Sequence, residues 1–232
     1  MAARLAPSLP DDDVMPLRGP ALAERLIQTL PPSGPALFNP WKARCLHDRH
    51  AGAPAQRRAR LSAHLDCDAR LLLVGEAVGY QGGRYSGIAF TSERLLGEGR
   101  IPRIEPTARL THRPLPFSEP SATIVWRELQ SLGLHEHTVL WNALPLHPHR
   151  PDQPWSNRTP SRPEFALGRE SIRMLVDAFP DAVVVAVGRH AQAVVGEVLG
   201  RAVVGIRHPA YGGATEFAEG LRRTLRARAS RR

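Results

Sequence analysis

The sequence has 232 residues and a formal net charge of +9 at pH 7. Hydrophobic residues make up 42% of it and charged residues 23%, which is ordinary for a globular chain and suits a single α/β domain. No apolar run is long enough to cross a bilayer, and residues 1–20 lack the apolar core of a signal peptide. We therefore expect a cytoplasmic protein without a membrane partner.

The positive charge predicts a polyanionic partner, because a surplus of this size favours association with nucleic acid. Lys42 is the only lysine among the 31 lysine and arginine residues, and the planar guanidinium of arginine suits phosphate oxygens. The alternative is a general bias toward arginine, which would carry no information about a partner.

The sequence contains no complete set of ligands in a pattern typical of a metal or cluster site. The two cysteines, Cys45 and Cys67, cannot supply four thiolates to an iron–sulfur cluster and lack the C-x-x-C spacing of a zinc site. His147 and His149 flank a proline, but no third or fourth ligand is evident, and a loop that lines a phosphate is the better interpretation. The sequence therefore predicts no metal and no cofactor, with both cysteines as reduced thiols.

Hydrophobic periodicity and short apolar runs divide the chain into elements. Residues 1–36 form a partly flexible segment with one short helix at 21–30, and residues 37–228 form the domain. A second helix is predicted at 55–65, with Arg57, Arg58 and Arg60 facing outward. The remaining elements are a strand at 70–74, a glycine-rich loop at 75–90, a helix at 92–96, irregular chain at 97–120, a helix at 122–132, a strand at 138–141, a long loop at 145–163, a helix at 164–179, a strand at 182–187, a helix at 188–200, a strand at 202–206, a helix at 215–228 and a basic tail at 229–232.

Strands alternate with helices along the whole domain. This order predicts a single α/β domain with a parallel central sheet and helices on both faces. Ligands bind such sheets beyond the carboxyl ends of the strands. Three segments follow strand ends here, namely 75–90, 142–149 and 207–213, and we expect the functional site among them.

The first of these segments resembles a known motif. The run Gly75-Glu76-Ala77-Val78-Gly79 fits neither a P-loop nor the G-x-G-x-x-G dinucleotide motif. It is similar to the G-E-A-P-G motif of uracil-DNA glycosylases, and the likeness continues through Ser86-Gly87-Ile88-Ala89-Phe90. The strand that ends in Asn142 and the turn Arg207-His208-Pro209-Ala210 resemble two further motifs of that superfamily, in the same order and spacing, so that the resemblance covers residues 38–228.

The resemblance implies a monofunctional glycosylase that hydrolyses the N-glycosidic bond of a flipped-out deaminated base in DNA, with uracil as the first candidate. Phe90 would stack on the base, and the amide of Asn142 would read its edge. His208 would stabilise the negative charge on the departing base. Gly75, Ala77 and Gly79 would line the base-binding pocket. Each of the three side chains also has a structural interpretation: a core phenylalanine, an asparagine that closes a turn, and a histidine held by backbone contacts.

Contacts to DNA are expected around this pocket. Tyr211 is a candidate for the wedge that fills the gap left by the extruded base, although the aliphatic wedge of the relatives would align with Gly212. The other candidates are polar side chains that would contact phosphates, and for each arginine the alternative is a solvated side chain. These candidates are Arg84, Ser92, Arg189 and Arg207, together with Arg150 and Arg158 in the long loop.

Two positions depart from the best-known branch of the superfamily. Ala77 stands where that branch has a catalytic aspartate, and Gly79 where it has a tyrosine that excludes the thymine methyl. Glu76 is the only carboxylate of the loop and is therefore the candidate general base. Three functions stay open: a monomeric glycosylase, a non-catalytic or weakly active member that binds damaged DNA, and a hydrolase of small nucleosides or nucleotides.

Overall fold

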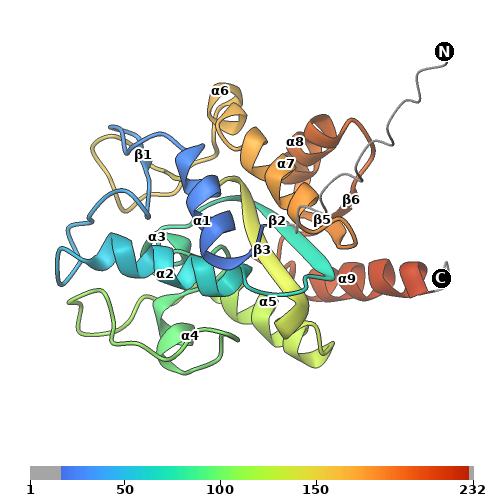
Figure 1. The fold of residues 1–232 in the computed structure, drawn as a ribbon, viewed down its shortest axis with the longest axis horizontal. Coiled ribbons are helices and arrows are strands. Elements are labelled where there is room, and N and C mark those ends of the chain that lie inside the picture. Colours follow the sequence, from blue (N-terminus) through green and yellow to red (C-terminus); the bar gives the residue numbers. More distant parts are fainter. Residues whose placement is uncertain (1–16, 230–232) are drawn as a thin grey trace, which may run out of the picture.

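The computed structural model describes residues 17–229, so the flexibility expected for residues 1–16 and the tail at 230–232 lie outside the described residues. Four parallel strands form the central sheet, which confirms the predicted architecture (Figure 1). A separate two-stranded antiparallel sheet ties the N-terminal part of the chain to the long loop. The central strands lie in the order β3 (Thr138–Leu144), β2 (Leu71–Ala77), β5 (Val183–Val187) and β6 (Val204–Ile206), and the small sheet consists of β1 (Leu37–Phe38) and β4 (His147–Pro148).

The central strands are apolar on both faces. Leu72 and Val74 of β2 belong to one core, whereas Leu71 and Leu73 of the same strand belong to the other. A strand buried on both sides needs a continuous apolar run rather than an alternating one. This requirement explains why four consecutive apolar residues precede Gly75.

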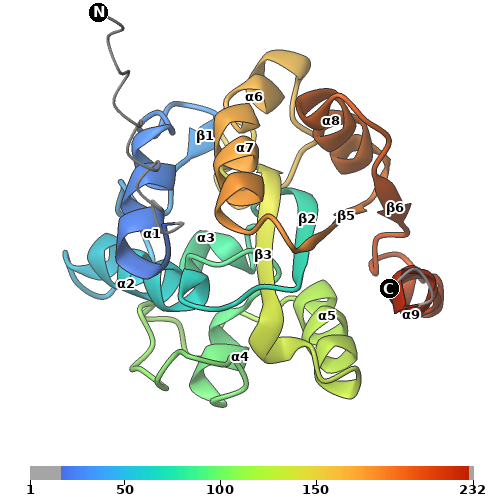
Figure 2. The same ribbon diagram turned by 45° about the vertical axis from the view of Figure 1, so that its right-hand side comes forward.

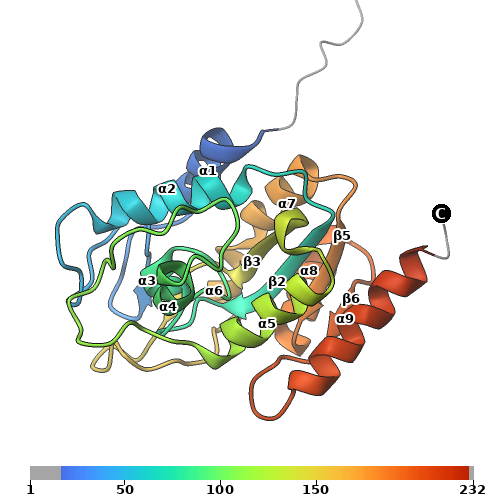
Figure 3. The same cartoon turned by 90° about the horizontal axis from the view of Figure 1, so that it is seen from below.

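Helices cover both faces of the sheet, as predicted (Figures 2 and 3). Among the helices of residues 17–229, none has the length and apolarity that crossing a membrane requires. The first core is covered by α1 (Gly19–Gln28), α2 (Ala53–Leu65), α7 (Arg169–Ala178) and α8 (Arg189–Leu199), and the second by α4 (Glu93–Gly97), α5 (Pro120–Ser131) and α9 (Ala214–Ala229). The short helices are α3 (Gly83–Ser86), the 3-10 turn η1 (His135–His137) and α6 (Arg162–Ala166).

One predicted helix is divided in the structure. The stretch at 164–179 forms α6 and α7, which are separated near Gly168. A Cβ atom at Gly168 would collide with the carbonyl oxygen of Ala143, so the chain passes against the backbone of β3 at this point. The periodicity of the side chains does not reveal such a backbone contact.

The prediction that the arginines of α2 face outward is wrong for Arg57 and Arg60, which are 0% and 4% exposed. The guanidinium of Arg57 donates from Nη1 and Nη2 to the two carboxylate oxygens of Asp48, both at 2.8 Å. Its Nε donates to the carbonyl of Pro40 at 2.6 Å. A guanidinium can be buried when a carboxylate neutralises it and its donors are satisfied. This pair ties the segment before α2 to the helix, whereas Arg58 is exposed.

We predict that Asp48→Ala lowers the free energy of unfolding by about 3–5 kcal/mol, because it leaves the Arg57 guanidinium buried without a counter-charge. Urea denaturation measures the change. The matched control is Glu98→Ala, which removes the partly exposed pair between Arg94 and Glu98 and should cost no more than about 1 kcal/mol. Equal losses for the two variants would contradict this account of the buried pair.

Candidate active site

The segments that the sequence predicted to form the site do meet at the carboxyl ends of the strands. Gly75 of β2 is in register with Asn142 of β3. The chain leaves β5 through Gly188 into α8, and it leaves β6 through Arg207 and His208. Figure 2 shows these strands side by side, so their following loops share one edge of the sheet.

Gly75 lies in close contact with two of the predicted side chains. A Cβ atom placed on Gly75 would lie 2.7 Å from Oδ1 of Asn142 and closer still to the ring of Phe90. Real Cβ atoms do not approach other atoms this closely, so only glycine fits here. The aromatic ring and the amide therefore meet over the bare backbone at the end of β2.

Phe90 is held in an uncommon conformation. Its φ is +49°, in the left-handed region that residues other than glycine seldom adopt. Its side chain is buried, and its ring centroid lies 6.0 Å from that of His208. Backbone strain of this kind persists only where the surroundings hold it, and it clusters at functional sites.

The side chain of Asn142 is buried but chemically available. Within residues 17–229 it makes no hydrogen bond, although an amide can donate two and accept at least one. Its amide atoms are not among the fully enclosed side-chain atoms that lack a partner, so they face space that a bound molecule can occupy. Asn142 can therefore offer both a donor and an acceptor to a bound molecule.

His208 is half-buried on the loop after β6. The backbone N–H of Ala210 donates to its Nδ1 at 3.1 Å, so the neutral ring carries its proton on Nε2. Burial is the main cause that lowers the pKa of His208; the charge of Arg207 acts in the same direction, and the carboxylate of Glu76 opposes both. The ring is thus a neutral donor near pH 7.

Glu76 is paired with a residue that sequence reasoning missed. Nδ1 of His190 lies 2.8 Å from the carboxylate of Glu76. His190 is in the first turn of α8, 114 positions further along the chain. No local sequence pattern predicts a contact between residues so far apart in the chain. The only carboxylate of the glycine-rich loop is therefore already engaged.

A second carboxylate, also missed, lies against the same loop. Glu119 precedes α5, and its Oε1 lies 3.3 Å from the position that a Cβ of Gly79 would take. Its other carboxylate oxygen is packed against Gly82. The hydroxyl of Ser121 donates to Oε1 at 2.6 Å, yet burial dominates and raises the pKa of Glu119. The absence of side chains at Gly79 and Gly82 makes room for this group.

Comparison with known families assigns the chain to one of them. The sequence profile described as "Uracil DNA glycosylase superfamily" matches residues 63–226, more than half of the chain. The chain belongs to the uracil DNA glycosylase superfamily. The superfamily predicted from the sequence is thereby confirmed, and membership supports DNA glycosylase activity in general.

A solved structure shares the fold of this superfamily member. The crystal structure of wild-type SMUG2 from Pedobacter heparinus matches with a TM-score of 0.60 and 16% sequence identity, over 90% of this chain and 98% of that chain. At this identity the likeness concerns the fold alone. No curated protein matches the sequence.

Two of the predicted phosphate contacts of this glycosylase-family chain are contradicted by burial. The guanidinium of Arg84 donates to Nδ1 of His147 at 2.6 Å and stacks on the ring of Phe38 at 3.8 Å. It is buried in the molecule and cannot reach DNA in this conformation. Ser92 is also buried, and its hydroxyl has no hydrogen-bond partner within the described residues.

The remaining candidates for DNA contact differ in availability. Arg189 and Arg207 are exposed beside the site and make no side-chain hydrogen bond within residues 17–229. Tyr211 is 98% exposed with φ of +52°, so its ring projects from the loop after His208. Arg150 is exposed in the long loop. Arg158 instead forms an ion pair with Glu164, with Nη2 at 2.5 Å from Oε1.

The histidines of the long loop are structural in this fold rather than available to phosphate. His147 and His149 are buried, with ring centroids 5.4 Å apart. Burial and the neighbouring Arg84 lower the pKa of His147 to about 3, and its Nε2 lies 3.0 Å from the carbonyl oxygen of Ser156. Within residues 17–229, no group of three or more His, Cys, Asp or Glu side chains is arranged to hold a metal.

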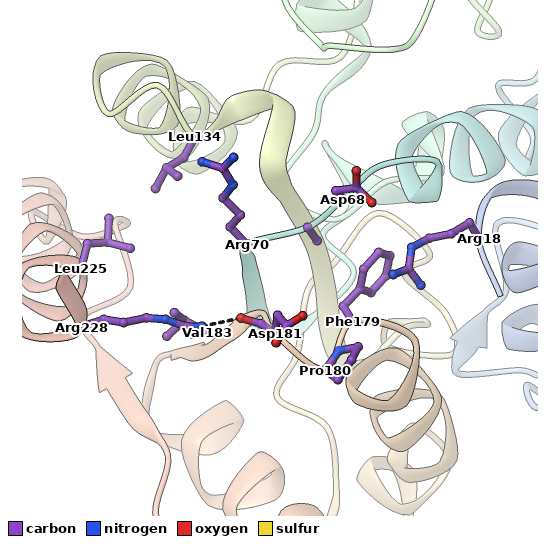
Figure 4. Close-up of a pocket in the computed structure, with 11 residues that line it drawn as sticks. Arg18, Asp68, Arg70, Leu134, Phe179, Pro180, Asp181, Val183, Leu225 and Arg228 are labelled. Carbon is purple, nitrogen blue, oxygen red and sulfur yellow. Dashed lines mark hydrogen bonds between the residues drawn. The ribbon is translucent and has the colours of Figure 1, made fainter. Parts of the chain in front are cut away.

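A cavity lies away from this site, at the amino ends of the strands (Figure 4). It has a volume of about 910 Å³ and lies beside Arg70, which precedes β2, and Asp181, which precedes β5. The sidechains of Arg18 and Arg228 are bonded to the carbonyls of Ala178 and Asp181. This cavity is not the candidate functional site, because none of the motif residues lines it.

We predict that Gly75→Ala lowers the free energy of unfolding by about 1–3 kcal/mol, because the new methyl group displaces Phe90 and Asn142. The matched control is Gly196→Ala in α8, where a Cβ would lie at an ordinary 3.4 Å from the carbonyl of Arg201. That variant should be stabilised by about 0.5–1 kcal/mol, because alanine is the better helix former. Chemical denaturation measures the free energy of unfolding of both variants. A Gly75→Ala protein as stable as the wild type would contradict the close approach of Phe90 and Asn142 to Gly75.

Proposed function

We propose that this protein is a monofunctional DNA glycosylase that hydrolyses the N-glycosidic bond of a flipped-out deaminated base, with uracil as the preferred base. The observation that carries the proposal is the meeting of Phe90 and Asn142 over Gly75, with the amide of Asn142 unbonded to described residues. An aromatic face beside a free amide is what recognition of an extruded base requires. The net charge of +9 favours DNA over a free nucleoside as substrate.

Uracil complements this pair of groups. Its ring would stack on Phe90, while its O4 accepts from the amide nitrogen of Asn142 and its N3–H donates to the amide oxygen. Cytosine presents the opposite pattern at these two positions, so the amide would have to turn over to pair with it. Hypoxanthine shares the carbonyl and N–H pattern of uracil, so a deaminated purine is the second substrate to test.

His208 would act on the leaving group. As the glycosidic bond breaks, negative charge develops on O2 of the base, and the Nε2–H of the neutral ring would donate to it. The bond from Ala210 holds the ring in the required tautomer before the substrate arrives. A neutral imidazole donor of lowered pKa is an established way to stabilise a developing oxyanion.

Neither residue that follows Gly75 supplies a free carboxylate to the hydrolytic water. Ala77 offers only a methyl group, and Glu76 is engaged by His190. We propose that stabilisation of the leaving group supplies most of the rate, which implies a slow enzyme, because a positioned general base is worth roughly a hundred- to ten-thousand-fold. The same feature favours one other function, a non-catalytic member that binds damaged DNA.

Cleavage of the DNA strand through a Schiff base is not part of the proposal, because that chemistry uses an amine nucleophile. Lys42 is the only lysine, and its ammonium donates to the carbonyl oxygen of Leu30 at the end of α1. Covalent trapping of DNA on Lys42 by borohydride would refute a monofunctional enzyme.

The direct test is incubation with oligonucleotides that each carry one uracil, hypoxanthine or xanthine, followed by alkaline cleavage at abasic sites. We expect cleavage at uracil, slow but above the background of the undamaged strand. Binding of the damaged strand without release of any base would favour the non-catalytic alternative.

We predict that His208→Ala and Asn142→Ala each slow base release under single-turnover conditions, His208→Ala by roughly a hundred- to a thousand-fold. The lowered pKa of His208 keeps its ring neutral, so the wild-type rate should stay level as the pH falls to the usual pKa of histidine, 6.5, and decline only below it. Circular dichroism controls for folding. A wild-type rate in His208→Ala would remove this residue from the mechanism.

We predict that Glu76→Gln retains most of the activity, within about ten-fold, since stabilisation of the leaving group does not need this carboxylate. Glu119→Gln is the matched comparison, because it neutralises the other carboxylate that touches the loop. Both are measured by single-turnover release of uracil. Complete loss of excision in either variant, with folding and DNA binding intact, would identify that carboxylate as the general base and overturn the proposal.

We predict that affinity for DNA falls steeply with salt, with a slope of roughly −0.9 in log K against log salt for each phosphate contact. Arg189→Ala should reduce the slope by about one contact. Arg201→Ala is the matched control, because this exposed arginine follows the far end of α8, at the amino edge of the sheet. Identical slopes for the two variants would count against a phosphate contact at Arg189.

A further inference from the structure

The side chain of Trp155 stands out among the four tryptophans. It is 60% exposed, whereas Trp41, Trp126 and Trp141 are each 2% exposed or less. A single exposed apolar side chain needs no explanation by itself. Its setting in the fold supplies the reason to consider a function.

Trp155 projects from a tightly bonded turn. The backbone N–H of Gln153 donates to the carbonyl of Arg150 at 3.0 Å, and that of Ser156 donates to the carbonyl of Gln153 at 2.9 Å. The hydroxyl of Ser156 accepts the backbone N–H of Arg150 at 3.0 Å, which closes the turn. Pro151 and Pro154 further restrict the backbone. The indole is therefore presented to solvent on a rigid support.

This turn is joined to the glycine-rich loop of the candidate active site. The side-chain oxygen of Asn157 accepts the backbone N–H of Tyr80 at 2.9 Å, and Tyr80 directly follows Gly79. The carbonyl of Ser156 lies 3.0 Å from Nε2 of His147, whose ring centroid lies 5.8 Å from that of Tyr80. The residues on the C-terminal side of Trp155 are thus bonded to the loop that lines the proposed base pocket.

We propose that Trp155 stacks on an undamaged, unpaired base that neighbours the flipped-out base on the same DNA strand. The proposal rests on the proposed function in taking DNA as the partner and in placing the stacked base beside a flipped-out one. One exposed indole face matches one base face, and such stacking tolerates any base sequence. The guanidinium of Arg150, on the same turn, is exposed and donates to Oε1 of Gln153 at 3.3 Å, which leaves its other N–H groups for the adjoining phosphate.

A protein partner fits this surface less well. Apart from two prolines, the residues around Trp155 on the turn are polar, namely Asp152, Gln153, Ser156 and Asn157. A stable protein interface buries about 800 Å² on each partner around an apolar centre, which one indole among polar side chains does not provide. A base stack needs only the single ring.

Intrinsic fluorescence provides a specific test. Because the other three tryptophans are buried, a change in the fluorescence of the exposed tryptophan on ligand binding reports on Trp155. The full-length protein is titrated with a short undamaged oligothymidine and with a strand of equal length made of abasic spacers. Both strands carry the same phosphates, but only the first offers bases. We expect oligothymidine to quench the exposed tryptophan emission and to protect it from acrylamide, and the abasic strand to do neither.

Variants then measure the contribution to affinity. Trp155→Ala should weaken binding of oligothymidine about 5- to 150-fold, which corresponds to the usual strength of one base–aromatic stack, and leave binding of the abasic strand unchanged. Trp155→Phe should restore most of the loss because it keeps an aromatic face. Arg150→Ala should instead weaken binding of both strands equally.

Three results would overturn the proposal, and the first two would overturn it alone. Unchanged tryptophan emission at saturating oligothymidine, or equal weakening of both strands by Trp155→Ala, would exclude stacking while leaving the proposed glycosylase function intact. Absence of binding of either strand by the wild-type protein would contradict DNA as the partner and so the proposed function as well. Neither measurement depends on catalysis, since the strands contain no damaged base.

Discussion

The arrangement of the candidate site depends on one steric constraint, the close approach at the end of β2. Because Gly75 has no side chain, the ring of Phe90 and the amide of Asn142 can both lie against its backbone. Phe90 keeps a left-handed backbone conformation to do so, which the buried loop around it must sustain. The same approach brings the ring within 6.0 Å of His208, so that three strand ends contribute to one site.

The arginines of the molecule include buried ones that stabilise the fold and exposed ones that are available to a partner. Arg57 and Arg84 are internal: one is paired with Asp48, and the other is bonded to His147 and stacked on Phe38. They hold the long segments beside the glycine-rich loop, and their burial removes them from contact with DNA. Exposed arginines at the carboxyl edge of the sheet, such as Arg189 and Arg207, are free for phosphate contacts. The net charge alone therefore overstates the charge available to a polyanion.

Much of the fold and part of the site could be predicted from the sequence. The strands were recognisable because each is a short apolar run, and Asn142 and His208 because each follows such a run in the order of a known family. The burial of Arg57 and Arg84 could not be predicted, since each depends on a partner brought near by folding. His190 and Glu119 were missed for the same reason. His190 is 114 positions from Glu76 in the sequence, and Glu119 is about forty positions from Gly79. The break at Gly168 depends on a backbone contact with β3 that leaves no mark on side-chain periodicity.

The central claim is that a base enters the space between Phe90, Asn142 and His208. It is tested most directly by a crystal structure of the His208→Ala protein with uracil-containing DNA. The account predicts the uracil stacked on the ring of Phe90, with its O4 and N3–H bonded to the amide of Asn142. A base that remains in the DNA stack, or one bound in the arginine-lined cavity at the amino ends of the strands, would contradict it.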